Sequence, residues 1–213
     1  MNKKDNNWLK RLISTNSFEY KDGELIVLKT PVWLYPLNTS VILQKTLEDK
    51  YGKDIADLYY GLGKMQAEMG MNQMLKIFGY KKDLKFLKDS MDQPKTIGYG
   101  NLNLERYDEK SKTIFFKNTN TPFARKYMEL FGVQKEPVDH FIRGACAAAG
   151  EVMFGEECLA IEQTCIAQGK EFCIFEVKPL KNWNPKDLMI KKQSVKKVGL
   201  IEKNRGLKKF LKK

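Results

Sequence analysis

The chain has 213 residues, of which 42% are hydrophobic and 30% are charged, a composition typical of a folded globular protein rather than a disordered or fibrous one. It contains no apolar run of about 18 residues, the length that a transmembrane helix needs. The first residues also lack the apolar core of a secretory signal. We therefore expect neither a membrane-spanning nor a secreted protein, and the expected location is the cytoplasm.

The formal net charge of +12 comes mainly from the C-terminal end. Residues 181–213 contain eleven lysines and one arginine against two acidic residues, so the rest of the chain is close to neutral. A basic segment of this kind is most often a solvated extension, although clustered lysines also attract nucleic acid, anionic lipid or an acidic partner. We divide the chain into an N-terminal extension with a short helix (1–22), a globular domain (23–179) and a basic tail (180–213).

Hydrophobic periodicity predicts several helices and two strand-like segments in the first half of the chain. In chain order the predicted elements are a short helix, a strand, an extended apolar segment and three helices, at 8–13, 24–28, 32–37, 41–51, 54–75 and 82–91. Thr39 and Ser40 are the predicted caps of the helix at 41–51. Glycines in the long helix indicate either close backbone packing or a break near Gly70.

In the second half of the chain the hydrophobic periodicity changes from helical spacing to alternation. Apolar and polar residues alternate over 96–118 on both sides of a turn at 107–111, which predicts a β-hairpin. Two helices follow, opened by Thr121 and Pro137, and the second is rich in glycine and alanine, which allow close packing. A second hairpin is predicted at 158–177. Together these elements predict an α+β fold with helices packed on one face of an antiparallel sheet.

All four cysteines lie between Cys146 and Cys173. A secreted disulfide scaffold would spread its cysteines over distant loops, so this clustering indicates a metal site, redox chemistry or simple burial. Cys146 lies among alanines and Cys158 begins a strand, and we interpret both as buried packing residues. For Cys158 the alternative is a redox partner of the other cysteines.

Glu162, Cys165 and Cys173 form the pattern most typical of a metal site. On a regular strand Glu162 and Cys165 would point to opposite faces of the sheet, so joint ligation requires the strand to bend or end near Thr164. Antiparallel pairing then returns Cys173 to a place beside Cys165. Two thiolates and one carboxylate suit Zn²⁺. The alternative is a pair of buried cysteines beside a surface glutamate.

A fourth ligand has to come from outside this hairpin. His140, the only histidine, and its neighbour Asp139 both lie at the start of the helix that is rich in small residues. We place His140 in the predicted site, with Asp139 as its alternative. A water molecule or a substrate would leave an open coordination position.

Methionines in the long helix and aromatic residues in the first hairpin are able to line an adaptable apolar pocket. The predicted lining residues are Tyr59, Met65, Met69 and Phe115. Ordinary helical core packing is the alternative interpretation.

Three segments of the sequence resemble the 4-vinyl reductase domain family, over roughly Gly23 to Val177. They are GKMQAEMG, GYGNLNLERYDEKSKTIFFKN and VDHFIRGACAAAGEVMFGEECLAIEQTCIAQGKEFCIFEV. The positions that match the family pattern most specifically are Gly144, Gly150, Gly155, Glu162, Cys165, Gly169, Cys173 and Phe175. Related domains are the sensory halves of aromatic-responsive bacterial transcription activators, a protein linked to bacteriochlorophyll synthesis and, more distantly, subunits of vesicle-tethering complexes.

In the activator sensors the resemblance implies a zinc site, an apolar ligand cavity nearby and a homodimer. The zinc ligands there are a cysteine at the start of a helix, a glutamate and two hairpin cysteines. Glu162, Cys165 and Cys173 match three of these positions. The helix-start cysteine is absent, and Asp139 stands in its place with His140 beside it.

The leading hypothesis is a cytoplasmic sensor or ligand-binding module for a small hydrophobic molecule, with output through a dimer or a partner protein. The alternative is a zinc-dependent enzyme or a reductase-associated protein with an open metal position. The sequence has no strand followed by a G-x-G-x-x-G motif, no nucleophile elbow and no second histidine, so we assign no catalytic residue. A third hypothesis is an interaction protein that binds nucleic acid, membrane or an acidic partner through its basic tail.

Overall fold

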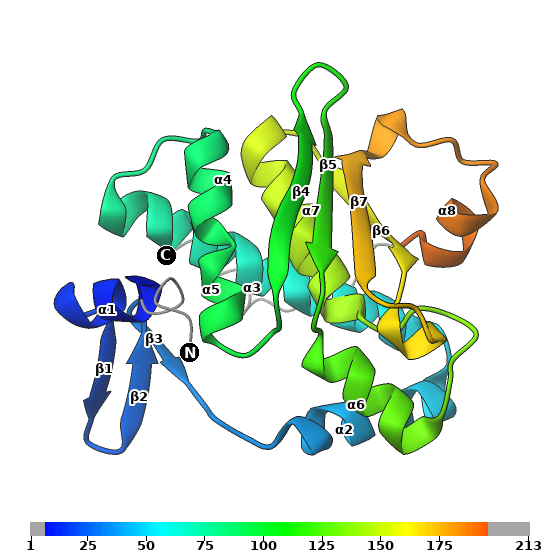
Figure 1. Ribbon diagram of the computed structural model, residues 1–213, viewed down its shortest axis with the longest axis horizontal. Coiled ribbons are helices and arrows are strands. Elements are labelled where there is room, and N and C mark those ends of the chain that lie inside the picture. The colour runs from blue at the N-terminus through cyan, green and yellow to red at the C-terminus, as the bar shows by residue number, and fades with distance from the viewer. Residues whose placement is uncertain (1–6, 196–213) are drawn as a thin grey trace.

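A four-stranded antiparallel sheet forms the centre of the computed structural model, which describes residues 7–195 (Figure 1). Its strand order is β4-β5-β7-β6, so two sequential hairpins are joined by pairing between β5 and β7. The strands are β4 (Leu102–Asp108), β5 (Thr113–Asn118), β6 (Cys158–Thr164) and β7 (Cys173–Pro179). Both predicted hairpins and the predicted α+β fold class are confirmed.

Two helices form successive layers on this sheet. Helix α7 (His140–Phe154) packs against β6 and β7, and helix α3 (Asp54–Phe78) packs against α7. Because α7 lies between a sheet and another helix, most of its surface is buried, and its run of alanines and glycines keeps it thin. This arrangement explains why that segment carries so few large side chains.

The backbones of α3 and α7 approach each other at two glycines. A Cβ atom on Gly63 would lie 1.9 Å from the carbonyl oxygen of Phe141, and one on Gly144 would lie 1.9 Å from the carbonyl oxygen of Tyr60. Real Cβ atoms do not approach backbone oxygens so closely, so only glycine fits either position. The predicted close backbone packing is therefore present.

The remaining helices surround these layers (Figure 1). Helices α4 and α5 lie beside β4, α2 and α6 lie together near the start of α7, and α8 lies beside β6. Their bounds are α1 (Asn7–Ser14), α2 (Leu37–Tyr51), α4 (Leu84–Ser90), α5 (Asp92–Thr96), α6 (Pro122–Phe131) and α8 (Leu188–Gln193). Thr121 caps α6 as predicted, its hydroxyl accepting from the backbone N–H of Ala124.

The N-terminal elements form a separate small sheet. Strands β1 (Phe18–Lys21), β2 (Glu24–Val27) and β3 (Thr30–Val32) pair antiparallel in sequential order, and they stand apart from the central sheet with α1 (Figure 1). Leu12 and Leu28 are buried and anchor this unit.

Two expectations about the first half need correction, and one of two alternatives is excluded. The extended segment at 32–37 is not a strand beyond Val32, because Pro36 interrupts regular pairing and initiates α2 instead. Helix α2 therefore begins at Leu37, before the predicted caps. Helix α3 does not break near Gly70 but continues to Phe78.

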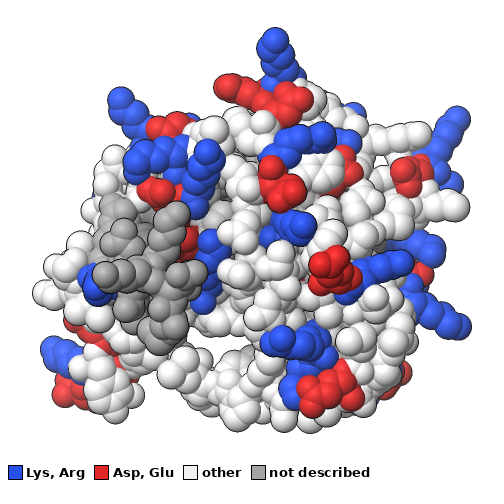
Figure 2. All heavy atoms as spheres, viewed as in Figure 1, with Lys and Arg blue, Asp and Glu red and all other residues white. Residues whose placement is uncertain are grey.

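Charge on one face of the molecule is mixed rather than segregated (Figure 2). On the face shown in Figure 2, lysine, arginine and acidic side chains lie among one another without a continuous basic field. Among the helices of residues 7–195, none combines the length and apolarity needed to cross a bilayer. Of the predicted basic tail, residues 180–195 form a short 3₁₀ turn and α8, and the short amphipathic helices predicted around Gly199 and Gly206 lie outside the described residues.

We predict that Gly63→Ala lowers the free energy of unfolding by about 1–3 kcal/mol, because the new methyl group overpacks the backbone of α7. Gly70→Ala is the matched control in the same helix. There the new Cβ meets only the amide end of the Gln93 side chain, at 3.0 Å, which is free to move aside. Chemical denaturation of both variants checks the difference, and equal stability of the two would contradict the close packing at Gly63.

Candidate metal centre

Four buried side chains converge at the N-terminal end of α7. They are Asp139, Glu162, Cys165 and Cys173, and each offers a ligand atom within 4.8 Å of the others. None of the four is more than 1% exposed. They come from three separate parts of the chain: the start of a helix and the two strands of the last hairpin.

An irregularity in β6 brings the hairpin ligands together. The register between β6 and β7 shifts between Glu162 and Thr164, and the strand ends there. A single 3₁₀ turn at Ile166–Gln168 and a left-handed Gly169 then reverse the chain toward Cys173. The condition that joint ligation requires, a strand that bends or ends near Thr164, is met. Without that bend, the strand would direct Cys165 away from Glu162.

Asp139 enters the cluster from the N-cap position of α7. Its Oδ2 atom accepts a hydrogen bond from the Thr121 hydroxyl at 2.8 Å and from the Cys173 thiol at 3.5 Å. Its backbone N–H donates to Glu162 Oε2 at 3.2 Å. These bonds hold both carboxylates beside the two sulfur atoms.

One oxygen of each carboxylate is left without a partner. Asp139 Oδ1 and Glu162 Oε1 are buried and accept no hydrogen bond within the part of the chain that the structure describes. Unsatisfied buried oxygens are uncommon in folded proteins, and they often mark a place where an ion binds. Two such atoms in one cluster of four donor groups fit a cation.

The shifted pKa values of the four groups also indicate that the cluster suits a cation. Burial raises the pKa of Asp139 to about 8 and the pKa of Glu162 well above its usual range. A hydrogen bond from Cys173 lowers the pKa of Cys165, while the same bond raises that of Cys173. Four acidic groups in a buried space cannot all ionise without a compensating positive charge. A divalent cation would supply it.

The donor set suits Zn²⁺, which accepts thiolate sulfur and carboxylate oxygen in tetrahedral geometry. Its composition of two sulfurs and two oxygens differs from the thiolate-rich sets of most structural zinc sites. The residues present therefore fit the predicted metal, and the identity of the ion stays a prediction.

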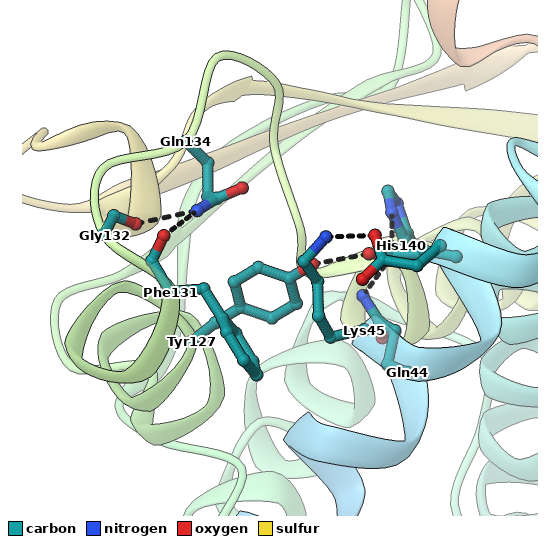
Figure 3. A network of polar contacts seen from close by, with 9 residues as sticks. Gln44, Lys45, Tyr127, Phe131, Gly132, Gln134 and His140 are labelled. Atoms are coloured by element: carbon teal, nitrogen blue, oxygen red, sulfur yellow. Dashed lines mark hydrogen bonds and ion pairs between the residues drawn. The ribbon is translucent and has the colours of Figure 1, made fainter.

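His140, the predicted fourth ligand, points toward helix α2 and is not part of the cluster (Figure 3). Its Nε2 lies 3.4 Å from Glu48 Oε1 on α2, and the same carboxylate accepts a hydrogen bond from the Tyr127 hydroxyl and another from Gln44. The pKa of His140 is lowered by burial. Of the two residues considered as the fourth ligand, Asp139 is the one that lies with Glu162 and the cysteines.

An apolar cavity of about 70 Å³ lies between α3, α5, α7 and the first hairpin. Met71, Met91, Phe116 and Ile142 contribute apolar wall, and Cys146 lines it as well. Polar residues line it too, and among them the Gln66 amide donates to the Tyr99 hydroxyl at 3.3 Å.

The residues predicted to line a pocket do not line this cavity. Phe115 points to the opposite face of the sheet, where Arg106 lies 4.3 Å from its ring centre, and its neighbour Phe116 points inward. On α3 the cavity is lined by Met71 and not by the predicted Met69, because the face of α3 that carries its glycines is the one turned toward α7. Tyr59 also lies off the cavity.

A larger groove of about 800 Å³ lies on the other side of α3 and does include Met65. Tyr60, Leu159, Trp183 and Ile190 form part of its wall. Cys158 also lines this groove.

Sequence reasoning missed Gln66 and Tyr99 as cavity residues. A single glutamine on a helix and a tyrosine in a glycine-rich loop carry no spacing that distinguishes them from surface residues. Cys146 was predicted to be a buried packing residue, and burial is confirmed for both Cys146 and Cys158, which are free thiols.

Comparison with known proteins identifies the fold. No protein-family model matches the chain. The uncharacterized protein MJ1460 of Methanocaldococcus jannaschii is 26% identical over 157 residues, which cover 73% of this chain and 84% of that protein. The phenol-responsive sensory domain of the transcription activator PoxR, solved with phenol, has a TM-score of 0.74 at 16% identity, covering 92% of this chain and 100% of that one.

A vinyl-4-reductase family protein from M. jannaschii is also similar, with a TM-score of 0.45 at 20% identity over 84% of this chain and 96% of that one. The resemblance that the sequence predicted is confirmed, and the fold of the chain is that of the PoxR sensory domain.

We predict that Zn²⁺ affinity falls as the pH is lowered from about 8 to about 6. Metal ligands must lose their protons, and burial has raised the pKa of Asp139 to about 8, so protons already compete with the metal near neutral pH. Each displaced proton weakens binding by about tenfold per pH unit. Competition with a chromophoric chelator across this range measures the slope, and a flat profile would contradict the ligand assignment.

Proposed function

We propose that this chain is a cytoplasmic sensor domain in which a zinc ion organises the wall of a binding cavity for a small hydrophobic molecule. One observation carries the proposal: the helix that lines the cavity is the helix whose N-cap joins the four-ligand cluster. Ile142 and Cys146 of α7 face the cavity, and Asp139 precedes them by less than two helical turns. Any shift of α7 therefore affects both the cavity and the four-ligand cluster.

The cavity chemistry indicates the class of ligand. Its walls are mainly apolar, and Tyr99, Gln66 and Ser90 provide hydrogen-bonding groups. A volume of about 70 Å³ restricts the occupant to a small molecule. A compact aromatic ring with one hydroxyl group matches the chemistry of these walls, and the PoxR domain, which shares the fold, was solved with phenol. Because a cavity that holds benzene has a volume of about 150 Å³, binding of such a ring requires the walls to move apart. We propose a phenol-like ligand.

The metal would have a structural role. Of its proposed ligands, Asp139 precedes the three in the last hairpin by more than 20 residues, so the ion would tie that hairpin to the start of α7 and stabilise the folded state. The cluster provides four protein ligands, which is the number that structural zinc sites use. This closed set favours the sensor over the zinc-enzyme alternative, which requires an open position.

Output is proposed to pass through a homodimer. The segment between β3 and α2 exposes neighbouring apolar side chains, with Trp33 83% and Leu34 81% accessible. Large exposed apolar groups that are grouped together often mark contact surfaces. We assign this segment to the contact with a second copy of the chain.

We predict one equivalent of zinc per chain after purification under reducing conditions, measured by elemental analysis. Cys165→Ser and Cys173→Ser should both abolish stoichiometric metal. Cys158→Ser is the matched control, because Cys158 is buried in another part of the sheet and should leave the metal content unchanged. Metal-free wild-type protein would refute the proposed centre.

We also predict that phenol raises the melting temperature of the wild-type protein and that Ala145→Leu removes this effect. Ala145 lines the cavity, so the larger side chain occupies the space of the ligand. Ala56→Leu, a substitution on α3 away from the cavity, is the control and should retain the response. A ligand at about 100 times its dissociation constant stabilises the folded state by about 2.7 kcal/mol. No shift with phenol or related small aromatic alcohols would contradict the proposed ligand class.

A further inference from the structure

Helix α8, the last helix of residues 7–195, reaches the candidate metal centre through one side chain. We propose that Gln193 is a positioning residue for Glu162 and that it couples α8 to the occupancy of the centre. This inference rests on the proposed metal site. It adds a residue that orients one of the ligands and a coupling between metal binding and the docking of α8.

Gln193 pairs with the backbone of Glu162 in both directions. Its Nε2 donates to the Glu162 carbonyl oxygen at 2.9 Å, and its Oε1 accepts from the Glu162 N–H at 2.9 Å. Strand β6 is an edge of the central sheet, so within residues 7–195 no further strand pairs with this side of it. The glutamine amide therefore supplies the pair of hydrogen bonds that a neighbouring strand would supply.

This clamp acts where the strand is least constrained by its own sheet. The ladder with β7 shifts register immediately after Glu162, and the regular pairing opposite Phe175 ends there. A backbone held on only one side at such an irregularity has freedom to rotate its side chain. With Gln193 on the outer side, the carboxylate of Glu162 is held toward Asp139 and the cysteines.

Arg143 ties the clamp to the second ligand-bearing element. Its guanidinium Nη1 donates to the Gln193 carbonyl oxygen at 2.6 Å and contacts Gln193 Oε1 at 3.3 Å. Arg143 is 2% exposed and belongs to α7, which begins directly after Asp139. The last residue of α8 is thus bonded to β6 and α7, the elements from which Glu162 and Asp139 enter the cluster.

Two consequences follow from this geometry. Loss of the clamp should weaken metal binding by about 10- to 100-fold, the range observed when residues that orient metal ligands are removed. Coupling between two binding events is reciprocal, so the metal must in turn stabilise the docking of α8. Helix α8 itself belongs to the basic tail (180–213), so occupancy of the centre would determine how firmly this described part of the tail is docked.

The first experiment measures Zn²⁺ affinity of the full chain by competition with a chromophoric chelator. Gln193→Ala should raise the dissociation constant by about tenfold or more. Ser194→Ala, a change of the adjacent exposed residue, should leave it unchanged. Gln193→Glu keeps the acceptor for the Glu162 N–H but loses the donor, and should give an intermediate value. It also serves if the alanine variant does not fold.

A second readout separates positioning from general stability. Co²⁺ bound in place of Zn²⁺ reports the geometry of its ligands, and its visible absorption spectrum should change in Gln193→Ala because the carboxylate of Glu162 is displaced. Hydrogen exchange of the wild-type backbone over residues 188–193 should slow when Zn²⁺ is added. A spectral change, or slowing of exchange that is larger in α8 than in the rest of the chain, is not expected if Gln193 contributes only to folding, because metal binding by itself slows exchange through global unfolding everywhere.

The outcomes distinguish this inference from the proposed function. If the wild-type chain binds no metal, the centre itself is refuted. If it binds metal but Gln193→Ala has wild-type affinity and spectrum, and α8 exchanges at the same rate with and without Zn²⁺, the centre stands and the coupling through Gln193 is overturned.

Discussion

The close approach of α3 and α7 is the constraint on which the rest of the structure depends. Gly63 and Gly144 let the two backbones touch, and Gly150 lets α7 lie close to the sheet, where an added Cβ would lie 2.6 Å from Val177 Cγ1. The small residues that follow on α7 leave space beside it, and this space is the cavity. A thicker helix would fill that space and would also move Asp139 away from the last hairpin.

The cluster of Asp139, Glu162, Cys165 and Cys173 illustrates how burial changes the chemistry of ordinary residues. On the surface Asp139 and Glu162 would be ionised and hydrated, whereas burial in the interior raises the pKa of both carboxyl groups. Each also keeps one oxygen without a partner among the described residues. The cost of such an arrangement is hard to explain by packing alone, because apolar residues of similar volume would stabilise the same space better. A cation makes the four groups mutually favourable, which is why the cluster supports a metal centre.

Helix α7 and the short helix α8 connect the proposed functions of the domain. A ligand in the cavity would contact α7 through Ile142 and Cys146, and the same helix carries Asp139 at its start. Arg143 and Gln193 extend this connection to the C-terminal end of the described chain. The cavity, the four-residue cluster and α8 thus all contact α7, and this is the physical basis on which a binding event could be transmitted.

The sequence by itself determined the hairpins, most of the helices and three members of the cluster, because alternation, helical period and the spacing of Glu162, Cys165 and Cys173 are local patterns. Tertiary structure decided the rest. The choice between Asp139 and His140 depends on Glu48, a residue distant in sequence that engages the histidine. The sequence likewise did not determine which face of α3 and of the first hairpin lines the cavity. Neighbouring apolar residues have the same hydrophobic character, and only packing against α7 decides which of them points inward.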